Sequence, residues 1–179
     1  MSLDTLASPV TERVEPATLT RRQLRGLVDH SLGHSSWHPV TQADVDRFAI
    51  ATGDYQWIHT NPDRARRGPF GTAIAHGYLT LSLATTLISE VLEVTDAALV
   101  VNYGLDRVRF PAPLPVDALV RAEICCRQVR EVPGGIELIL RLTYQVREQH
   151  KPCCVADVVY RYYDEPGPPV RDSTGTVGR

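Results

Sequence analysis

The second half of the chain alternates between hydrophobic and polar residues with a period of two, which is the pattern of strands buried on one face. Runs over 118–129, 135–146 and 153–163 show this alternation, and Pro-Gly-Gly at 133–135 supplies a turn between the first two. The expected inward positions are Ala118, Val120, Ala122, Ile124 and Cys126; Ile136, Leu138, Leu140, Leu142, Tyr144 and Val146; and Cys154, Ala156, Val158, Tyr160 and Tyr162. A fourth run covers 98–110, where Gly104 shifts the alternation and predicts a bulge. At least four antiparallel strands are therefore expected.

The first half has helical periodicity instead. Residues 19–33 place leucines and a valine on one stripe and reach Gly33, which predicts a short amphipathic helix. A second helix is expected over 41–52, because Thr41 and Asp44 form a variant of the capping box and Gly53 stands where a helix ends. Between them, residues 36–40 predict a short strand.

Residues 77–94 differ from both helices, because their apolar side chains spread around most of a helical wheel. Such a helix must be enclosed, and a sheet with one apolar face needs a cover. The arrangement that satisfies both is an α+β hotdog fold, in which a curved antiparallel sheet wraps around a central buried helix. A single sheet layer of this kind exposes strand edges, so we expect a homodimer joined through these edges.

Length and composition favour one globular domain with short tails. The chain has 179 residues, of which 43% are hydrophobic and 22% charged, with a net charge of −2. We expect flexible segments at 1–18 and 164–179 around a domain at 19–163. The charge balance argues against nucleic-acid binding, and the lack of a long apolar run or signal-like start predicts a cytoplasmic protein without a membrane span.

Two groups of possible metal ligands have unsuitable spacing. The four cysteines form adjacent pairs at 125–126 and 153–154, and neighbours in a strand point to opposite faces. His30 and His34 stand four residues apart but lack the glutamate of the H-E-x-x-H motif. We therefore interpret the cysteines as small strand residues and expect no metal.

Candidate chemistry gathers just before the apolar helix. Asp54 follows Gly53, and Asn61-Pro62 begins another short helix, so Asp54 and His59 lie at the two ends of a compact loop. If the loop folds back, a carboxylate and an imidazole can share one water, which suits proton transfer at neutral pH. Gly77 opens the apolar helix, so its unpaired N–H can stabilise a carbonyl or enolate oxygen. A loop hydrogen bond for His59 and simple close packing at Gly77 remain structural alternatives.

These residues carry a resemblance. "ATGDYQWIHTNPDRA" followed by "GPFGTAIAHGYLTLSL" resembles the hydratase 2 motif of MaoC-like (R)-specific enoyl-CoA hydratases, and "VNYGLDRVRFPAPLPV" resembles the strand and proline-rich turn that follow it. The similarity runs from about Val40 to Tyr163. It implies Asp54 and His59 as the catalytic pair and the Gly77 amide as the thioester-oxygen donor. It also implies supporting roles for Gln56, where many members have asparagine, and for Ser82 or Thr85 in the helix.

The implied reaction is the reversible addition of water to trans-2-enoyl-CoA, giving (R)-3-hydroxyacyl-CoA without a metal or organic cofactor. Asn61 is a further supporting residue. Guanidinium groups pair well with phosphate, so candidates for the CoA phosphates are Arg64, Arg66, Arg67, Arg107 and Arg109. The motif does not decide whether Asp54 or His59 is the base.

Two other functions stay open on the same residues. A 3-hydroxyacyl carrier-protein dehydratase, or a subunit of a heteromeric one, would use this site in the opposite direction. A non-catalytic acyl-thioester-binding protein would keep the fold without the chemistry, although Asp54, His59 and Gly77 together argue for an enzyme. A hotdog thioesterase does not explain this pair.

Overall fold

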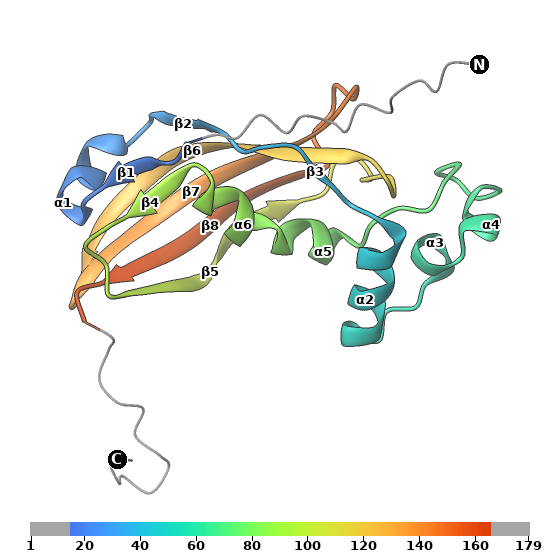
Figure 1. Cartoon of the computed structure of the whole chain (residues 1–179), viewed down its shortest axis with the longest axis horizontal. Coiled ribbons are helices and arrows are strands. Elements are labelled where there is room, and N and C mark those ends of the chain that lie inside the picture. The colour runs from blue at the N-terminus through green and yellow to red at the C-terminus, as the bar shows by residue number, and fades with distance from the viewer. Residues whose placement is uncertain (1–14, 166–179) are drawn as a thin grey trace, which may run out of the picture.

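A curved antiparallel sheet packed against a short helical segment forms the body of the molecule (Figure 1). This computed structural model describes residues 15–165. The sheet has six strands: β2 (Ser31–His34), β3 (His38–Pro39), β5 (Leu99–Arg109), β6 (Leu119–Val132), β7 (Gly135–Val146) and β8 (Cys154–Tyr163). Their order is β2-β6-β7-β8-β5, with β3 also paired to β6. The expected α+β hotdog fold is confirmed.

The long strands form where the alternation predicted them. Val132 pairs with Gly135 around a tight turn, and Gly134 takes a φ of 72° there, which glycine adopts without strain. The predicted bulge in β5 lies between Asn102 and Gly104, and a second register shift follows between Leu105 and Arg107. These irregularities bend β5, which pairs with β8 alone and leaves its other edge open.

The core lies on the inward faces of β6, β7 and β8. In these three strands, all of the predicted inward residues are at most 4% exposed. Tyr144 is fully buried, and its hydroxyl donates to the carbonyl of Leu81 at 3.2 Å. This bond ties the sheet to the helical segment that it covers, so the periodicity of two alone predicts the largest part of the core.

The central helix differs from its prediction in two ways. It consists of α5 (Gly77–Ser82) and α6 (Ala84–Ser89), which meet at Leu83, rather than one continuous helix. Leu81, Ala84, Leu87 and Ile88 are buried on one face. The opposite face is exposed and carries Tyr78, Ser82, Thr85, Thr86 and Ser89. The prediction of burial on all sides was therefore wrong, because the sheet of one chain covers only one face.

The expected helix over 19–33 is confirmed only for residues 21–27 and is wrong at both ends. The chain forms β1 (Ala17–Leu19), α1 (Arg21–Leu24) and the 3-10 turn η1 (Arg25–Leu27), and then enters β2. Asp29 has a φ of 62°, a left-handed conformation that ends helical structure. The leucines fit a helical stripe, but pairing with β6 claims residues 31–34 for the sheet.

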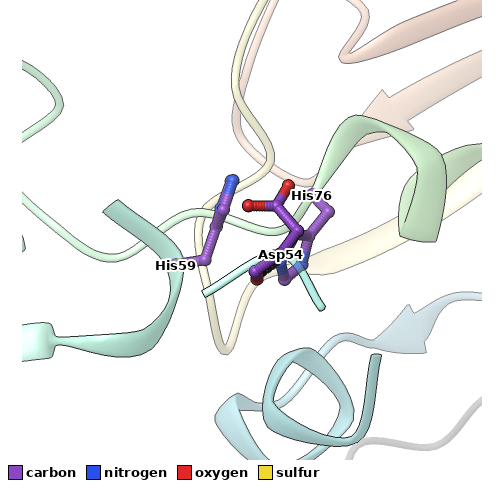
Figure 2. A group of neighbouring side chains, drawn as sticks. All are labelled: Asp54, His59 and His76. Carbon is purple, nitrogen blue, oxygen red and sulfur yellow. Dashed lines mark hydrogen bonds between the residues drawn. The ribbon is translucent and has the colours of Figure 1, made fainter. Parts of the chain in front are cut away.

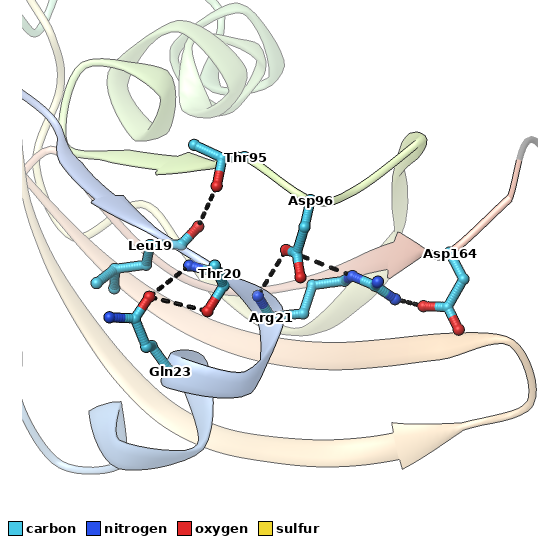
Figure 3. Close-up of polar contacts among 7 residues, drawn as sticks. All are labelled: Leu19, Thr20, Arg21, Gln23, Thr95, Asp96 and Asp164. Atoms are coloured by element: carbon cyan, nitrogen blue, oxygen red, sulfur yellow. Dashed lines mark hydrogen bonds and ion pairs between the residues drawn. The ribbon is translucent and has the colours of Figure 1, made fainter.

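Some residues just outside the expected domain limits of 19–163 also contact the folded part of the chain. Strand β1 pairs in parallel with β4 (Leu92–Val94), which includes Ala17 and Thr18 in the fold. Arg21 forms ion pairs with Asp96 and Asp164, and so connects the N-terminal segment to the end of β8 (Figure 3). Residues 1–14 and 166–179 of the expected flexible segments lie outside the described residues.

Three helices gather beyond one end of the strands: α2 (Gln42–Thr52), α3 (Trp57–Thr60) and α4 (Pro62–Ala65) (Figure 1). The capping of α2 is confirmed, since the Thr41 hydroxyl accepts from the backbone N–H of Asp44 and Gly53 takes a left-handed φ of 76°. Asn61 caps α4 as expected, because its side chain accepts from Arg64 N–H at 2.9 Å. Helix α3 was not predicted.

Two further expectations can be compared with the described residues. His30 and His34 do not share a helix, since His34 belongs to β2. All four cysteines are free, and three of them are buried. Between residues 15 and 165, the structure has no helix with the length and hydrophobicity needed to cross a bilayer.

Candidate active site

The first member of the candidate site stands where α2 ends. The left-handed Gly53 turns the chain out of the helix, and Asp54 follows in a half-buried loop position. Its carboxylate accepts from the backbone N–H of Gln56 at 3.3 Å. This local bond is typical of aspartate in a turn and steadies the carboxylate before the next helical turn begins.

His59 is fixed by the single turn of α3. Its side chain is 6% exposed, and its Nδ1–H donates to the carbonyl of Ile74 at 2.7 Å. The backbone carbonyl of His59 accepts from the side-chain amide of Gln42 at 2.8 Å. Because Nδ1 carries the donated proton, Nε2 of the neutral ring is the acceptor and the proton-accepting atom.

A second buried histidine, His76, completes the group. It is 2% exposed and directly precedes α5. Its Nε2–H donates to the backbone carbonyl of Asp54 at 3.0 Å. Its ring stacks on that of His59, with centroids 3.9 Å apart and an interplanar angle of 28°. Two segments of the chain thus meet at these rings, one that carries Asp54 and His59 and one that carries Ile74 and His76.

Asp54, His59 and His76 each place one polar side-chain atom within 4.8 Å of the others (Figure 2). A metal ion needs ligand lone pairs that converge on one point about 2 Å away, whereas stacked imidazoles direct theirs along nearly parallel planes. No hydrogen bond links the carboxylate of Asp54 to His59 among the described residues, although their atoms lie within reach of a common water. The arrangement suits proton transfer through a water better than metal binding.

A cavity of about 310 Å³ opens beside His59. Its walls include His59, Gly77, Phe110 and the buried residue Cys153. Gly77 is the first residue of α5, so its N–H has no acceptor within the helix. A Cβ at Gly77 would lie 3.1 Å from the Phe110 ring, so glycine leaves room at this wall. Asp54 and His76 do not line this cavity in the isolated chain.

The electrostatics of the site keep His59 neutral over a wider pH range. Burial lowers the pKa of His59 from its usual value, and the neighbouring His76 acts in the same direction. The hydrogen bond to Ile74 and the charge of Asp54 oppose this shift without reversing it. A neutral imidazole can accept a proton at neutral pH, which a general base must do.

The lowered pKa of His59 predicts a loss of stability in acid. The unfolded chain binds a proton at His59 near pH 6.5, while the folded chain binds it only at lower pH. The free energy of unfolding should therefore decrease as pH falls from about 6.5 toward the folded pKa. Urea unfolding at pH 7.5 and 5.5 should show a smaller decrease in His59→Gln than in the wild type. Equal decreases in both proteins would contradict the assignment.

The two residues expected to support His59, Gln56 and Asn61, are both exposed. Gln56 is exposed, and its side chain makes no hydrogen bond to His59 in the described part of the chain. The carbonyl of Ile74 orients the ring instead. Asn61 caps α4 and is exposed, so its observed role is structural.

The two hydroxyl candidates in the central helix face different surroundings. The Ser82 hydroxyl donates to the carbonyl of Leu79 at 2.7 Å, and Ser82 lines a separate cavity of about 280 Å³ with Tyr78 and Leu105. The Thr85 hydroxyl lies 3.1 Å from that of Tyr160. Neither residue lines the cavity beside His59.

The five candidate arginines are all exposed, and none lines the His59 cavity. Arg64 stacks over the Trp57 ring at 4.5 Å, and Arg66 pairs with Asp63. Arg107 lies near Asp157 and lowers its pKa, although the main cause is the Asp157 hydrogen bond to Arg141. Arg109 donates to the carbonyl of Val108, and Arg67 is a surface residue. Their assignment to CoA phosphates stays a prediction.

Comparison with known proteins shows which family the chain belongs to. The sequence profile of the MaoC-like domain matches residues 24–145. The chain is 44% identical over 140 residues to the 3-hydroxyacyl-thioester dehydratase Z of Mycobacterium tuberculosis, covering 78% of this chain and 93% of that protein. It is 36% identical over 134 residues to nodulation protein N of Rhizobium leguminosarum bv. viciae, covering 73% and 83% of the two chains.

Solved structures agree on the fold. The (R)-hydratase from A. caviae involved in PHA biosynthesis superposes with a TM-score of 0.60 at 23% identity, over 75% of this chain and 96% of that chain. The chain therefore belongs to the MaoC-like dehydratase family, whose members here share a single hotdog domain.

Sequence reasoning missed His76 as a member of the site. The contacts of His76 with Asp54 and His59 depend on how the loop after α2 meets the start of α5, which the spacing of these residues does not show. The available signal was a histidine directly before an apolar helix, which needs a partner if it is buried.

Proposed function

We propose that this protein is a hydro-lyase that adds water reversibly to trans-2-enoyl-CoA and produces (R)-3-hydroxyacyl-CoA. The observation that carries the proposal is that His59 and Gly77 line one cavity, with a side-chain oxygen of Asp54 within 4.8 Å of a ring nitrogen of His59. A proton-transfer pair and an oxyanion donor are what hydration of a conjugated thioester requires. The named dehydratase and hydratase among the similar proteins support the same class of reaction.

In this mechanism, Asp54 and His59 hold one water between them. Nε2 of His59 takes a proton from the water as its oxygen forms a bond to C3 of the enoyl group. Electrons of the C2–C3 double bond move toward the thioester carbonyl, and the proton held by the pair is then delivered to C2. The step balances, because one O–H bond and the C2–C3 π bond break while a C3–O bond and a C2–H bond form, and C2 receives one proton for the proton that the water gives up.

Gly77 stabilises the charge that develops during this reaction. Its N–H would donate to the thioester oxygen, which becomes enolate-like when C3 is attacked. The thioester itself acidifies C2, so the proposed reaction uses no metal or organic cofactor. Treatment with a chelator followed by dialysis should therefore leave the rate unchanged.

The direct test is loss of the conjugated absorbance of crotonyl-CoA and longer enoyl-CoA substrates on addition of the wild-type protein. Chiral analysis of the product should give the (R)-alcohol. Thioester binding without turnover at any chain length would instead support an acyl-thioester-binding protein. Activity that appears only with a second polypeptide would support a dehydratase subunit.

A second candidate is a 3-hydroxyacyl carrier-protein dehydratase. It is favoured by the absence of all five candidate arginines from the walls of the His59 cavity, because a carrier protein would supply its own surface for docking. Comparing the same acyl group on CoA, on carrier protein and on pantetheine separates the two. A large preference in kcat/KM for the carrier-protein thioester would favour the dehydratase, and equal use of CoA and pantetheine would argue against CoA-phosphate recognition.

We also propose that two copies of the chain join at β5. This strand is an open edge of the sheet, and Val100, Tyr103 and Leu105 on it are 48%, 56% and 46% exposed. Tyr78 on the uncovered face of α5 is 73% exposed and shares a cavity with Leu105. A long edge strand with apolar side chains exposes a sheet to further pairing, so a second copy is the economical cover.

The dimer proposal predicts the behaviour of a charged variant. Leu105→Lys should shift the mass in sedimentation equilibrium from twice the monomer mass toward the monomer, because lysine side chains on both copies would repel at the joint. Val28→Lys is the matched control, since Val28 is 40% exposed and precedes β2 at the opposite edge of the sheet. A dimeric Leu105→Lys protein, or a monomeric wild type, would contradict the proposed interface.

A further inference from the structure

His76 contacts Asp54, His59 and the first turn of α5, which all take part in the proposed mechanism. Its side chain donates to the backbone of Asp54, and its ring lies flat against that of His59. Its own carbonyl accepts the backbone N–H of Thr80 at 3.0 Å and the Thr80 hydroxyl at 3.2 Å. These last bonds fix the first turn of α5, from which the N–H of Gly77 projects.

The ring of His76 is held in one orientation. The donation from Nε2 to a carbonyl leaves Nδ1 of the neutral ring as an acceptor. This Nδ1 is buried and has no hydrogen-bond partner within residues 15–165. Buried polar atoms are usually paired, and leaving one without a partner costs free energy. An apolar residue would pack here without that cost, so packing alone does not explain an imidazole at this position.

We propose that His76 is a positioning residue that holds the backbone of Asp54 through Nε2–H and backs the ring of His59, so that the carboxylate and Nε2 of His59 keep the separation that one shared water requires. This inference rests on the proposed hydro-lyase function. His76 does not line the His59 cavity, so it acts through Asp54 and His59 rather than on the substrate.

The charged and titratable groups that face His59 are few. Asp54 approaches from the loop after α2, and His76 from the start of α5. Cys153, which precedes β8, shares the cavity wall with His59. Burial is the main cause that lowers the pKa of His59, and His76 is the neighbour that adds to the effect. Removing the His76 imidazole should therefore raise the pKa of His59.

Two substitutions separate the hydrogen bond from the ring contact. His76→Phe keeps an aromatic ring against His59 but has no donor for the Asp54 carbonyl. His76→Gln loses the ring, while its amide nitrogen can take the place of Nε2. We expect His76→Phe to lower kcat by about 10- to 100-fold with KM nearly unchanged, as for the loss of an outer hydrogen bond that orients a reacting group. His76→Gln should recover most of that loss.

Spectroscopic measurements complement the kinetics. The His59 ring should titrate at a higher pH in both variants than in the wild type when followed by NMR. The carbonyl ¹³C shift of Asp54 should change in His76→Phe and stay near the wild-type value in His76→Gln, because only the latter keeps the donor. If His76→Phe does not fold, His76→Asn takes its place, since its shorter amide does not reach the Asp54 carbonyl.

Phe48→Leu provides the matched control. Phe48 packs against the His76 ring with centroids 5.0 Å apart, and its side chain has neither a donor nor an acceptor for the hydrogen bond between His76 and Asp54. This variant should retain wild-type kcat and an unchanged pKa of His59. Equal losses of kcat in His76→Phe and His76→Gln, or wild-type kcat in His76→Phe, would overturn the positioning role.

The two proposals fail in different ways. A wild-type protein that hydrates no enoyl thioester would overturn the proposed function. In that case the His59 titration and the Asp54 carbonyl shift would still decide whether His76 positions the pair. Unchanged values of both in His76→Phe would overturn the inference about His76 whatever the activity of the wild type.

Discussion

Replacing His59 with alanine is expected to lower kcat for enoyl-CoA hydration by about 10²- to 10⁴-fold, the range typical for loss of a positioned proton-transfer group. Asp54→Asn should cause a loss of similar size, because asparagine can keep the local turn but cannot carry a transferable proton. The double variant should be little worse than either single one, since the two residues act on the same water. The absorbance assay with crotonyl-CoA measures all three.

The control for Asp54→Asn is Asp63→Asn, which removes an exposed carboxylate of α4 that pairs with Arg66, the residue after that helix. This variant should retain wild-type kcat. Circular dichroism and thermal unfolding should show that every variant keeps the fold. Full activity in a folded His59→Ala protein would remove His59 from the mechanism and, with it, the proposed function.

Gly77 allows a test of the oxyanion donor although that donor is a backbone group. Proline lacks the N–H, and it is tolerated at the first position of a helix, where Gly77 stands. His76 has φ −61° and ψ 140°, an extended conformation that is compatible with a following proline. Gly77→Pro should therefore lower kcat by about 10²- to 10³-fold, the usual effect of losing one oxyanion donor.

Gly77→Ala is the matched variant, because it adds a Cβ but keeps the N–H. That Cβ would lie 3.1 Å from the Phe110 ring, which is 43% exposed and can move slightly. Comparing the two proteins isolates the donor from the steric change. If Gly77→Ala loses as much kcat as Gly77→Pro, the effect is one of space at the cavity wall, and the amide is not the oxyanion donor.

The sheet could be predicted from the sequence because its signal is local. Alternation fixes which side of each strand faces inward, and the Pro-Gly-Gly turn fixes the pairing of β6 with β7. Residues 19–33 show where this reasoning fails. Their leucines satisfy a helical stripe, yet residues 31–34 complete the edge of the sheet, and such pairing across about 90 positions leaves no trace in a short window.

The candidate site was likewise predictable only in part. The sequence indicates that one helix ends at Gly53 and that another begins at Asn61 and Pro62. The proximity of Asp54 and His59, which lie between these two helix ends, could therefore be expected. The orientation of the His59 ring could not, because its partner is the backbone carbonyl of Ile74, which any residue could supply. The exposure of one face of α5 and α6 could not be predicted either. A helical wheel of apolar and hydroxyl residues does not show how far one sheet extends around the helix.

Cys153 lines the cavity in which the proposed enoyl thioester would react. An enoyl thioester is a Michael acceptor, and a thiolate beside it would add to C3 and leave the enzyme alkylated by its own substrate. Burial raises the pKa of the Cys153 thiol to about 12, which keeps the thiol protonated at neutral pH. The same desolvation that would favour an acyl chain at this wall would thus protect the proposed enzyme from alkylation by its own substrate.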